Sequence, residues 1–374
     1  MTMWIIIAWT SIAFIVTAIF YLGAKIPDLV ACDTLAGWGK FKQFSLGLLI
    51  TLGFTGIIAL CIDFINALVC VLYLAMIWCV SDFVFWLMAK FANITFEHYY
   101  SGWTAIVISV LSLSVGWYLN HHIWQTDYEL TTNKDVGEFK IAMFADSHIG
   151  TTFNADEFAK HLTAIEAQNP DIVVVVGDYV DDDTSKEEMI KASKALGKMK
   201  TKHGVYFVSG NHDKGYYGAK HRGFSEQDLI DELQKDGVVV LHDETVLIDN
   251  SFYIIGRKDF SEFKEQRGSR LSMEELTANL DKNKYLIVLD HQPTDYENQA
   301  KSEVDLVLNG HTHGGQLFPF NQVGKWIKAN DLVYGHKKRN KTDFIVTSGI
   351  SDWAIKFKTG TKSEYVIINI KKGE

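Results

Sequence analysis

The sequence contains few cysteines and no surplus of basic residues. Its 4 cysteines (Cys32, Cys61, Cys70 and Cys79) form no C-x-x-C pair, so neither a disulfide scaffold nor a thiolate metal site is expected. Lys and Arg number 36 against 45 Asp and Glu. No basic surface is therefore offered to a nucleic-acid backbone, and nucleic acid is not expected as a partner.

Charge is also scarce at the start of the chain. Residues 1–130 hold 4 Lys and Arg and 7 Asp and Glu, whereas residues 131–374 hold 32 and 38. So few charges among long apolar runs are typical of membrane segments, and a charged, mixed composition is typical of a soluble domain. We therefore expect a membrane region followed by a soluble domain.

Long apolar runs predict a transmembrane region over residues 1–125. One crossing needs about 20 mainly apolar residues, and the run that begins at Trp4 has no Lys or Arg before it, which favours a retained helix over a cleaved signal peptide. The run from Phe44 to Phe91 is about twice the length of one crossing, so two helices are expected there. Trp and Tyr at both ends mark a further helix. The four expected helices are 4–22, 44–62, 66–91 and 103–120.

The lysines of this region predict its orientation. Lys25, Lys40 and Lys42 lie between the first and second helices, and Lys90 lies between the third and fourth. Because cytoplasmic loops are enriched in Lys and Arg, we expect a multi-pass protein of the cell membrane whose soluble domain is extracytoplasmic.

Two aspartates fall within the apolar runs. Asp63 and Asp82 could be functional groups inside the membrane, as in a transporter. Alternatively, Asp63 lies in a solvated turn and Asp82 is a carboxylate paired within the helix bundle. We favour the second interpretation, because four helices with so few polar groups make a poor transport pathway.

The remainder of the chain reads as a short linker and an α/β domain. Residues 126–137 are polar and without apolar periodicity, and residues 138–374 alternate β-branched runs with helical stretches. Strands are expected over 139–144, 172–176, 205–208, 238–241, 252–255, 285–289, 304–308, 344–346 and 365–370, and helices over 156–168, 186–198, 226–235 and 273–280.

Polar clusters follow five of these strands. Asp146 to Asp178 is 32 residues and Asp178 to Asn211 is 33, an interval that suits one βαβ unit. The clusters should therefore meet at the carboxyl edge, where open α/β sheets bind their ligands. They contain Asp146 and His148, then Asp178 and Asp181, then Asn211 and His212, then His291, and finally His311 and His313.

Carboxylate, amide and imidazole ligands without thiolates favour borderline-hard divalent cations. Two cations about 3.5 to 4 Å apart need a bridging carboxylate and can clamp both oxygens of a displacement at phosphorus. Asp178 is the residue that we expect to bridge.

The order D-x-H, GD-x-x-D, GNHD, H and GH-x-H over Asp146 to His313 resembles the calcineurin-like metallophosphoesterase superfamily. The GHTHGGQ form and the apolar N-terminus are most similar to its membrane-associated bacterial branch, which includes UDP-diacylglucosamine hydrolases and phosphodiesterases. The resemblance implies an αββα sandwich that follows the bundle of about four transmembrane helices.

The resemblance also implies roles for the residues. Asp146, His148 and His313 would hold one cation, Asn211, His291 and His311 the other, and Asp178 would bridge them. Manganese is the first expectation, with iron, zinc or nickel as alternatives. A metal-bound hydroxide would be the nucleophile, with His212 as general acid and Asp181 as the carboxylate that orients it.

We therefore expect a membrane-anchored phosphoesterase acting on a phosphodiester or pyrophosphate. Protein phosphatases of the superfamily carry an arginine after the second motif, whereas Asp182 and Asp183 follow Asp181 here, which disfavours a phosphoprotein substrate. The location suggests a lipid-linked or cell-envelope substrate near the bilayer. The alternative is a catalytically silent metal-binding receptor or scaffold.

The neighbours of the motifs admit two interpretations. Lys214 to Arg222 follow the third motif and would either receive substrate phosphate or form a surface loop. Asp182, Asp183 and Asp213 are expected to be solvated or to support the ligands from behind.

Overall fold

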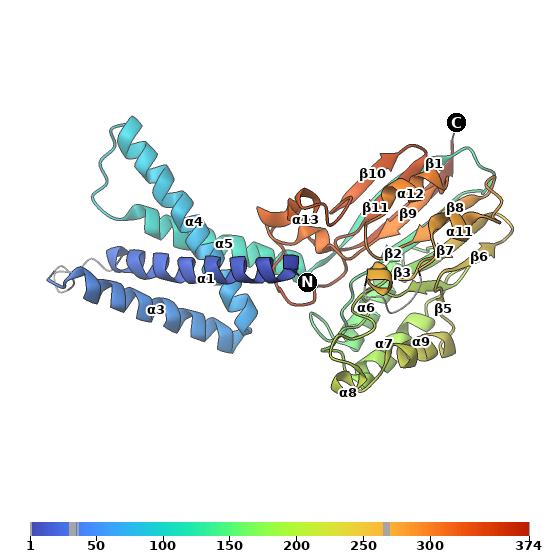
Figure 1. The fold of residues 1–374 in the computed structure, drawn as a ribbon, viewed down its shortest axis with the longest axis horizontal. Helices are drawn as coiled ribbons and strands as arrows, with labels where there is room; N and C mark the ends of the chain where they lie inside the picture. Colours follow the sequence, from blue (N-terminus) through green and yellow to red (C-terminus); the bar gives the residue numbers. More distant parts are fainter. Residues whose placement is uncertain (1, 30–34, 36, 265–269, 374) are drawn as a thin grey trace. The chain divides into compact units, whose positions relative to one another are not determined.

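The computed structural model describes the chain except residues 1, 30–34, 36, 265–269 and 374, so Cys32 lies outside the described residues. The chain divides into two compact units, residues 1–116 and 117–374 (Figure 1). The expected α/β domain therefore begins earlier than residue 138.

The first unit is helical. Each of its four long helices is apolar and long enough to cross a membrane. Most extend beyond the expected bounds because the helical backbone continues into polar flanks such as Lys40. The helices are α1 (Thr2–Leu29), α3 (Lys40–Cys61), α4 (Phe64–Phe91) and α5 (Tyr100–His121), the last of which runs into the second unit.

Asp63 and Asp82 make the contacts of a capping residue and a paired carboxylate. Asp63 is the N-cap of α4 and accepts a hydrogen bond from the backbone N–H of Asn66 at 2.8 Å. Asp82 lies 2.7 Å from the ammonium group of Lys25 and accepts from the Tyr99 hydroxyl at 2.8 Å. Tyr21 and Ser101 also donate to Asp82. This agrees with the turn-and-pairing interpretation.

The second unit contains two six-stranded sheets, with strand orders β1-β12-β2-β3-β4-β5 and β10-β11-β9-β8-β7-β6. In the first sheet β2, β3, β4 and β5 are parallel, and in the second β7, β8, β9 and β11 are parallel. The strands are β1 (Ile123–Thr132), β2 (Phe139–Phe144), β3 (Ile172–Val176), β4 (Val205–Val208), β5 (Val239–Val240), β6 (Glu244–Ile248), β7 (Phe252–Gly256), β8 (Tyr285–Leu289), β9 (Leu306–Asn309), β10 (Gly335–Arg339), β11 (Thr342–Val346) and β12 (Ser363–Lys372).

Three apolar layers hold this unit together. Val173 and Val175 of β3 face helices, whereas Val174 and Val176 face the other sheet, because side chains alternate along a strand. Helices α6 (Ala155–Glu166), α7 (Lys186–Gly197) and α9 (Glu226–Lys235) cover the first sheet (Figure 1). Helices α11 (Met273–Thr277) and α12 (Tyr296–Lys301) cover the second. The αββα sandwich is thus confirmed.

The expected linker over 126–137 is wrong for its first half. Ile123–Thr132 form β1, which pairs in parallel with β12 from Ile123 opposite Ser363 to Thr132 opposite Lys372. Gln125, Asp127 and Glu129 are exposed while the residues between them are partly or fully buried. This period of two reveals the strand, but an edge strand with a polar outer face lacks the continuous apolar run of the buried strands.

The other strands that the sequence did not predict are also at edges. β6 and β10 are the outer strands of the second sheet, and β10 carries Lys337, Lys338 and Arg339. Charged residues are common on edge strands because they prevent pairing with other chains. The short helices α8 (Ala219–Arg222), α10 (Phe260–Lys264) and α13 (Val323–Trp326) and the 3-10 turns η1 (His313–Gly315) and η2 (Phe320–Gln322) complete the fold.

Candidate metal centre

The predicted ligands lie in loops that follow β2, β3, β4, β8 and β9. Within each sheet these strands are parallel neighbours, so their carboxyl ends meet at a common edge. Hydrogen bonds join the loops, since the Asp146 N–H donates to the Gly177 carbonyl at 3.0 Å and the His311 N–H donates to the Asp146 carboxylate at 3.0 Å.

Five of the seven predicted ligands adopt a left-handed backbone conformation. This conformation is uncommon outside glycine and persists where the surrounding structure enforces it, often at functional sites. Gly177 shares it, with φ 78°, and a Cβ there would lie 2.5 Å from Nδ1 of His291. The φ angles are 56° for Asp146, 39° for His148, 52° for Asp178, 73° for His311 and 48° for His313.

The structure brings these side chains into two clusters. Asp146, His148 and His313 form the first, and Asp178, His291 and His311 form the second. Within each cluster, one ligand atom from each residue lies within 4.8 Å of the others. Apart from the half-buried His311, all six residues are buried. Each cluster thus offers one carboxylate and two imidazoles, a donor set suited to a divalent transition metal.

Asp178 faces both clusters. Its Oδ2 lies 3.0 Å from Nε2 of His291 and 3.9 Å from Nε2 of His148. Burial by itself would raise the pKa of Asp178, but the imidazoles of His291, His212 and His148 hold it well below its usual range. An ionised carboxylate between two clusters is the arrangement that a bridging ligand requires.

Several buried polar atoms of the centre lack hydrogen-bond partners. They include Nε2 of His148 and Oδ1 of Asn211, whereas Nε2 of His291 faces only the Asp178 carboxylate, at 3.0 Å. The other polar atoms of two of these side chains are engaged, since Nδ1 of His291 lies 2.8 Å from the Val176 carbonyl and the Asn211 amide donates to the Tyr216 hydroxyl at 2.9 Å. Because buried polar atoms are rarely left unpaired, these residues fit a pair of cations.

The electrostatics of the centre favour added positive charge. Burial lowers the pKa of His311 to about 4 and that of His313 to about 3, so both imidazoles are neutral, as metal ligation requires. Burial also opposes a charge on His148 and His291. Nevertheless Asp181 raises the pKa of His148, and Asp178 raises the pKa of His291. The carboxylates therefore attract protons to these two imidazoles, and bound cations would compete with those protons.

Asp352 is a residue of the centre that the sequence analysis missed. Its Oδ1 lies 2.8 Å from Nδ1 of His313, and its side chain is fully buried. It follows β11 by six residues in a loop without histidine. The only available signal was its place after a buried strand, which is too weak to single it out. A carboxylate behind a ligating histidine is a common means of fixing the ring.

Comparison with known proteins places this arrangement in a family. Residues 139–315 match the family of calcineurin-like phosphoesterases, and this range includes every predicted ligand. The chain contains a calcineurin-like metallophosphoesterase domain.

Relatives of this domain occur in bacteria and animals. An uncharacterized metallophosphoesterase of Campylobacter jejuni is 30% identical over 240 residues, which are 63% of this chain and 59% of the relative. A transmembrane protein with metallophosphoesterase domain from Danio rerio is 27% identical over 259 residues, 66% of this chain and 57% of the relative. An uncharacterized metallophosphoesterase of Aquifex aeolicus is 36% identical over 183 residues, 48% of this chain and 65% of the relative. The chain thus spans about three fifths of the length of such relatives.

In this metallophosphoesterase domain the close ion-pair contact of Asp181 is with a different histidine from the one that we expected. Its Oδ2 lies 3.2 Å from Nδ1 of His148, and the Thr151 hydroxyl donates to the same oxygen at 3.2 Å. The turn after Asp181 directs the carboxylate this way, because the Asp183 N–H donates to its other oxygen at 2.9 Å. The close imidazole contact of Asp181 is therefore with His148, and its role toward His212 stays a prediction.

His212 lies beside the bridging carboxylate. Its backbone N–H donates to Oδ1 of Asp178 at 2.8 Å, and its ring is 5.0 Å from that of His148, measured between centroids. Burial lowers the pKa of His212. The rings of Tyr216 and Trp353 flank it at 5.1 and 5.5 Å, and both of these are about half exposed.

The neighbours of the motifs prove to be structural supports. Asp213 is buried and accepts four backbone hydrogen bonds, from Asp178 and Gly210 at one oxygen and from Tyr179 and Val180 at the other. It therefore ties the loops after β3 and β4 together. Arg222 is buried and donates to the Asp213 carbonyl at 2.6 Å, so it supports the third motif and is not part of an exposed loop. Asp182 accepts the backbone N–H groups of Tyr216 and Tyr217.

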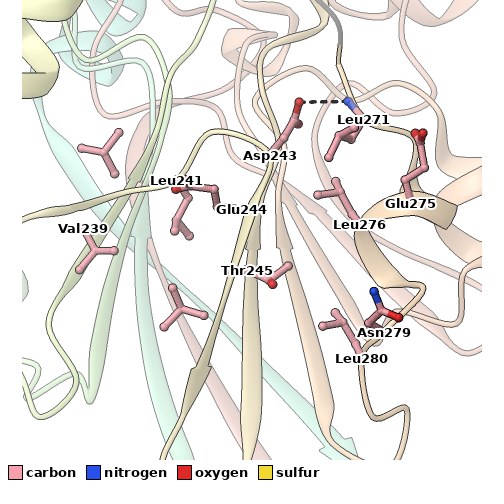
Figure 2. Close-up of a pocket in the computed structure, with 12 residues that line it drawn as sticks. Val239, Leu241, Asp243, Glu244, Thr245, Leu271, Glu275, Leu276, Asn279 and Leu280 are labelled. Carbon is pink, nitrogen blue, oxygen red and sulfur yellow. Dashed lines mark hydrogen bonds between the residues drawn. The ribbon is translucent and has the colours of Figure 1, made fainter.

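A groove elsewhere in the domain shares no lining residue with the metal centre. It lies between β5, β6 and the region of α11, and Figure 2 shows Leu241, Thr245, Leu276 and Leu280 around it. The Asp243 carboxylate accepts the Leu271 N–H at 3.0 Å (Figure 2). Asp243 is thereby engaged in joining two loops, and the groove offers no histidine.

Proposed function

We propose that this protein is a membrane-anchored phosphoesterase that uses two divalent cations to hydrolyse a phosphodiester or a pyrophosphate. The observation that carries the proposal is the position of Asp178, whose carboxylate lies within 4 Å of an imidazole of each cluster. When bound, two cations would polarise the phosphoryl oxygens and lower the pKa of water.

The ligand assignment follows the two clusters. Asp146, His148 and His313 would hold one cation, and Asp178 would contribute to both sites. Asn211, His291 and His311 would hold the other, with the unpaired Oδ1 of Asn211 as its amide ligand. Mixed oxygen and imidazole donors suit manganese, and also iron, zinc or nickel.

His212 is the proposed general acid. It lies next to Asn211 in the chain and against Asp178 in space, so a phosphoryl group held between the clusters would be within its reach. Burial favours its neutral form, so it would first take the proton that the attacking water loses and then donate that proton to the leaving oxygen. Asp181 and Asp352 would position His148 and His313 from behind.

The substrate is proposed to be lipid-linked or part of the cell envelope. Four helices of membrane length precede the domain, and the lysine distribution supports a domain outside the cytoplasm. Asp182 and Asp183, which stand where phosphoprotein phosphatases of this superfamily have arginine, disfavour an acidic phosphopeptide.

The test is hydrolysis by the full-length protein in detergent micelles. An aryl phosphomonoester, an aryl phosphodiester and a UDP-sugar pyrophosphate are compared with Mn²⁺ and with chelator. We expect diester or pyrophosphate cleavage that chelator abolishes, and no cleavage by Asp178→Asn, which should also bind less metal. Asp156→Asn changes an exposed carboxylate of α6 and is the control. Full metal loading without hydrolysis of any compound would favour the receptor or scaffold.

A shortened soluble form should retain β1. A chain that begins at residue 131 would lose eight of the ten strand positions that pair with β12. Failure of such a fragment would therefore not count against the proposed function.

A further inference from the structure

The segment Gln316–Lys328, which we call the aromatic loop, exposes an unusual amount of apolar surface. Phe318 is 61% exposed, Phe320 59%, Trp326 69% and Ile327 46%. These are four of the eleven exposed large apolar side chains in the described part of residues 117–374. Soluble proteins rarely gather such side chains on one short segment unless the surface binds something.

The exposure is built into the fold. Gln316 donates through its side chain to the Ile355 carbonyl at 2.6 Å, and its own carbonyl accepts the Thr359 N–H at 3.0 Å. Gly315, with φ 71°, packs so closely that a Cβ would lie 1.9 Å from the Asn321 carbonyl oxygen. The base of the loop is therefore fixed, and the loop continues through η2 and α13, neither of which has a buried residue.

The charges of the aromatic loop have one sign. Lys325 and Lys328 are its only charged residues, and both are exposed. Residues 131–374 as a whole hold 32 basic and 38 acidic residues, so the loop is a basic patch on an acidic domain. Exposed Trp and Phe beside Lys are typical of segments that lie in the interface of an anionic bilayer.

The aromatic loop is also joined to the metal centre. It begins three residues after His313, and η1 carries both His313 and the turn into the loop. A domain that follows four helices of membrane length would be tethered close to a bilayer.

We propose that the aromatic loop docks on an anionic lipid surface, with Phe318, Phe320 and Trp326 in the headgroup region and Lys325 and Lys328 against lipid phosphates. Docking would hold the metal centre close to the headgroups, because the loop begins three residues after His313. The docking itself does not depend on turnover, so its test is separate from that of the proposed function.

The experiment uses the full chain in vesicles of phosphatidylcholine with phosphatidylglycerol. The native cysteines are replaced by alanine, and the environment-sensitive dye NBD is attached to Trp326→Cys. The matched control carries the dye at Lys191→Cys, an exposed position on α7. We expect the dye at position 326 to shift its emission to the blue and to be quenched by lipids with nitroxide groups near the headgroup. The dye at position 191 should do neither.

Two results would overturn the proposal. One is an unquenched, water-like emission at position 326 in protein that still binds two metals per chain. The other is a blue shift without lipid quenching that grows with protein density, which would identify a second copy of the chain as the occupant. Adding Lys325→Glu and Lys328→Glu to the labelled protein should reduce quenching in anionic vesicles, because the charge attraction is reversed.

Discussion

The Asp352 carboxylate lies 2.8 Å from Nδ1 of His313, while Nε2 of the same ring lies 3.6 Å from Oδ1 of Asp146. One ring nitrogen thus faces a carboxylate that can fix the ring, and the other faces the proposed cation. Lys358 is completely buried, lies 3.6 Å from Asp352 and donates to the Ser348 carbonyl at 2.7 Å. The orientation of His313 therefore depends on two residues that would not themselves touch the cation.

Replacing Asp352 by asparagine should weaken metal binding without unfolding the domain. The amide keeps the size of the carboxylate but loses the charge that stabilises the Nδ1–H form of His313. Changes of this kind behind a ligating histidine cost about 10- to 100-fold in metal affinity. Metal affinity by chelator competition measures the effect, with Asp156→Asn as control. Unchanged affinity would show that the Ser351 carbonyl, 3.2 Å from the same nitrogen, is sufficient to fix His313.

Replacing Lys358 by methionine should destabilise the domain and weaken metal binding together. Methionine fills similar space but leaves Asp352 and the Ser348 carbonyl without their buried cation, and breaking a buried ion pair costs about 3–5 kcal/mol. The midpoint of denaturant unfolding of the full-length protein in detergent should fall. Lys194→Met, at an exposed position on α7, should leave it nearly unchanged. Equal midpoints for the two variants would contradict a supporting role for Lys358.

The fixed order of the motifs after buried strands was sufficient to bring the ligand residues to one edge of the sheets, and the resemblance to the superfamily divided them into two clusters. Four of those strands, β2, β3, β4 and β8, have the bounds that their apolar runs predicted. The partners of the clusters were less accessible. Asp352 meets His313 only through tertiary folding, and the turn that sends Asp181 to His148 depends on backbone geometry. Neither contact leaves a periodic signal in the sequence.

The limits of the fold prediction lie at the edges of the sheets. A central strand is buried on both faces and reads as a continuous apolar run, as Ile172–Val176 does. β1, β6 and β10 each expose one face or more, so polar residues interrupt their pattern. In β1 the alternation of Trp124, Thr126 and Tyr128 with exposed polar residues was the only sign of a strand.

Replacing Asp181 by asparagine tests whether this carboxylate acts on His148 or on His212. Because Asp181 lies 3.2 Å from Nδ1 of His148, we expect about a 10-fold loss of affinity for one cation. The dependence of the rate on the leaving group should stay as it is in the unchanged protein. Isothermal titration with Mn²⁺ and a series of aryl phosphodiesters measure the two quantities. Normal metal binding with an altered leaving-group dependence would instead make Asp181 a partner of His212.

Replacing His212 by alanine should preserve both cations and slow the reaction. The backbone N–H of residue 212, which donates to Asp178, remains in the variant, whereas the proton donor is lost. General acids contribute about 10²- to 10⁴-fold to rate, and the loss should be largest for leaving groups of high pKa, because nitrophenolate departs without protonation. His221→Ala, which changes an exposed histidine of α8, is the control. An equal loss for all leaving groups, or a loss of metal, would assign His212 to phosphoryl binding or to the metal centre instead of to proton donation.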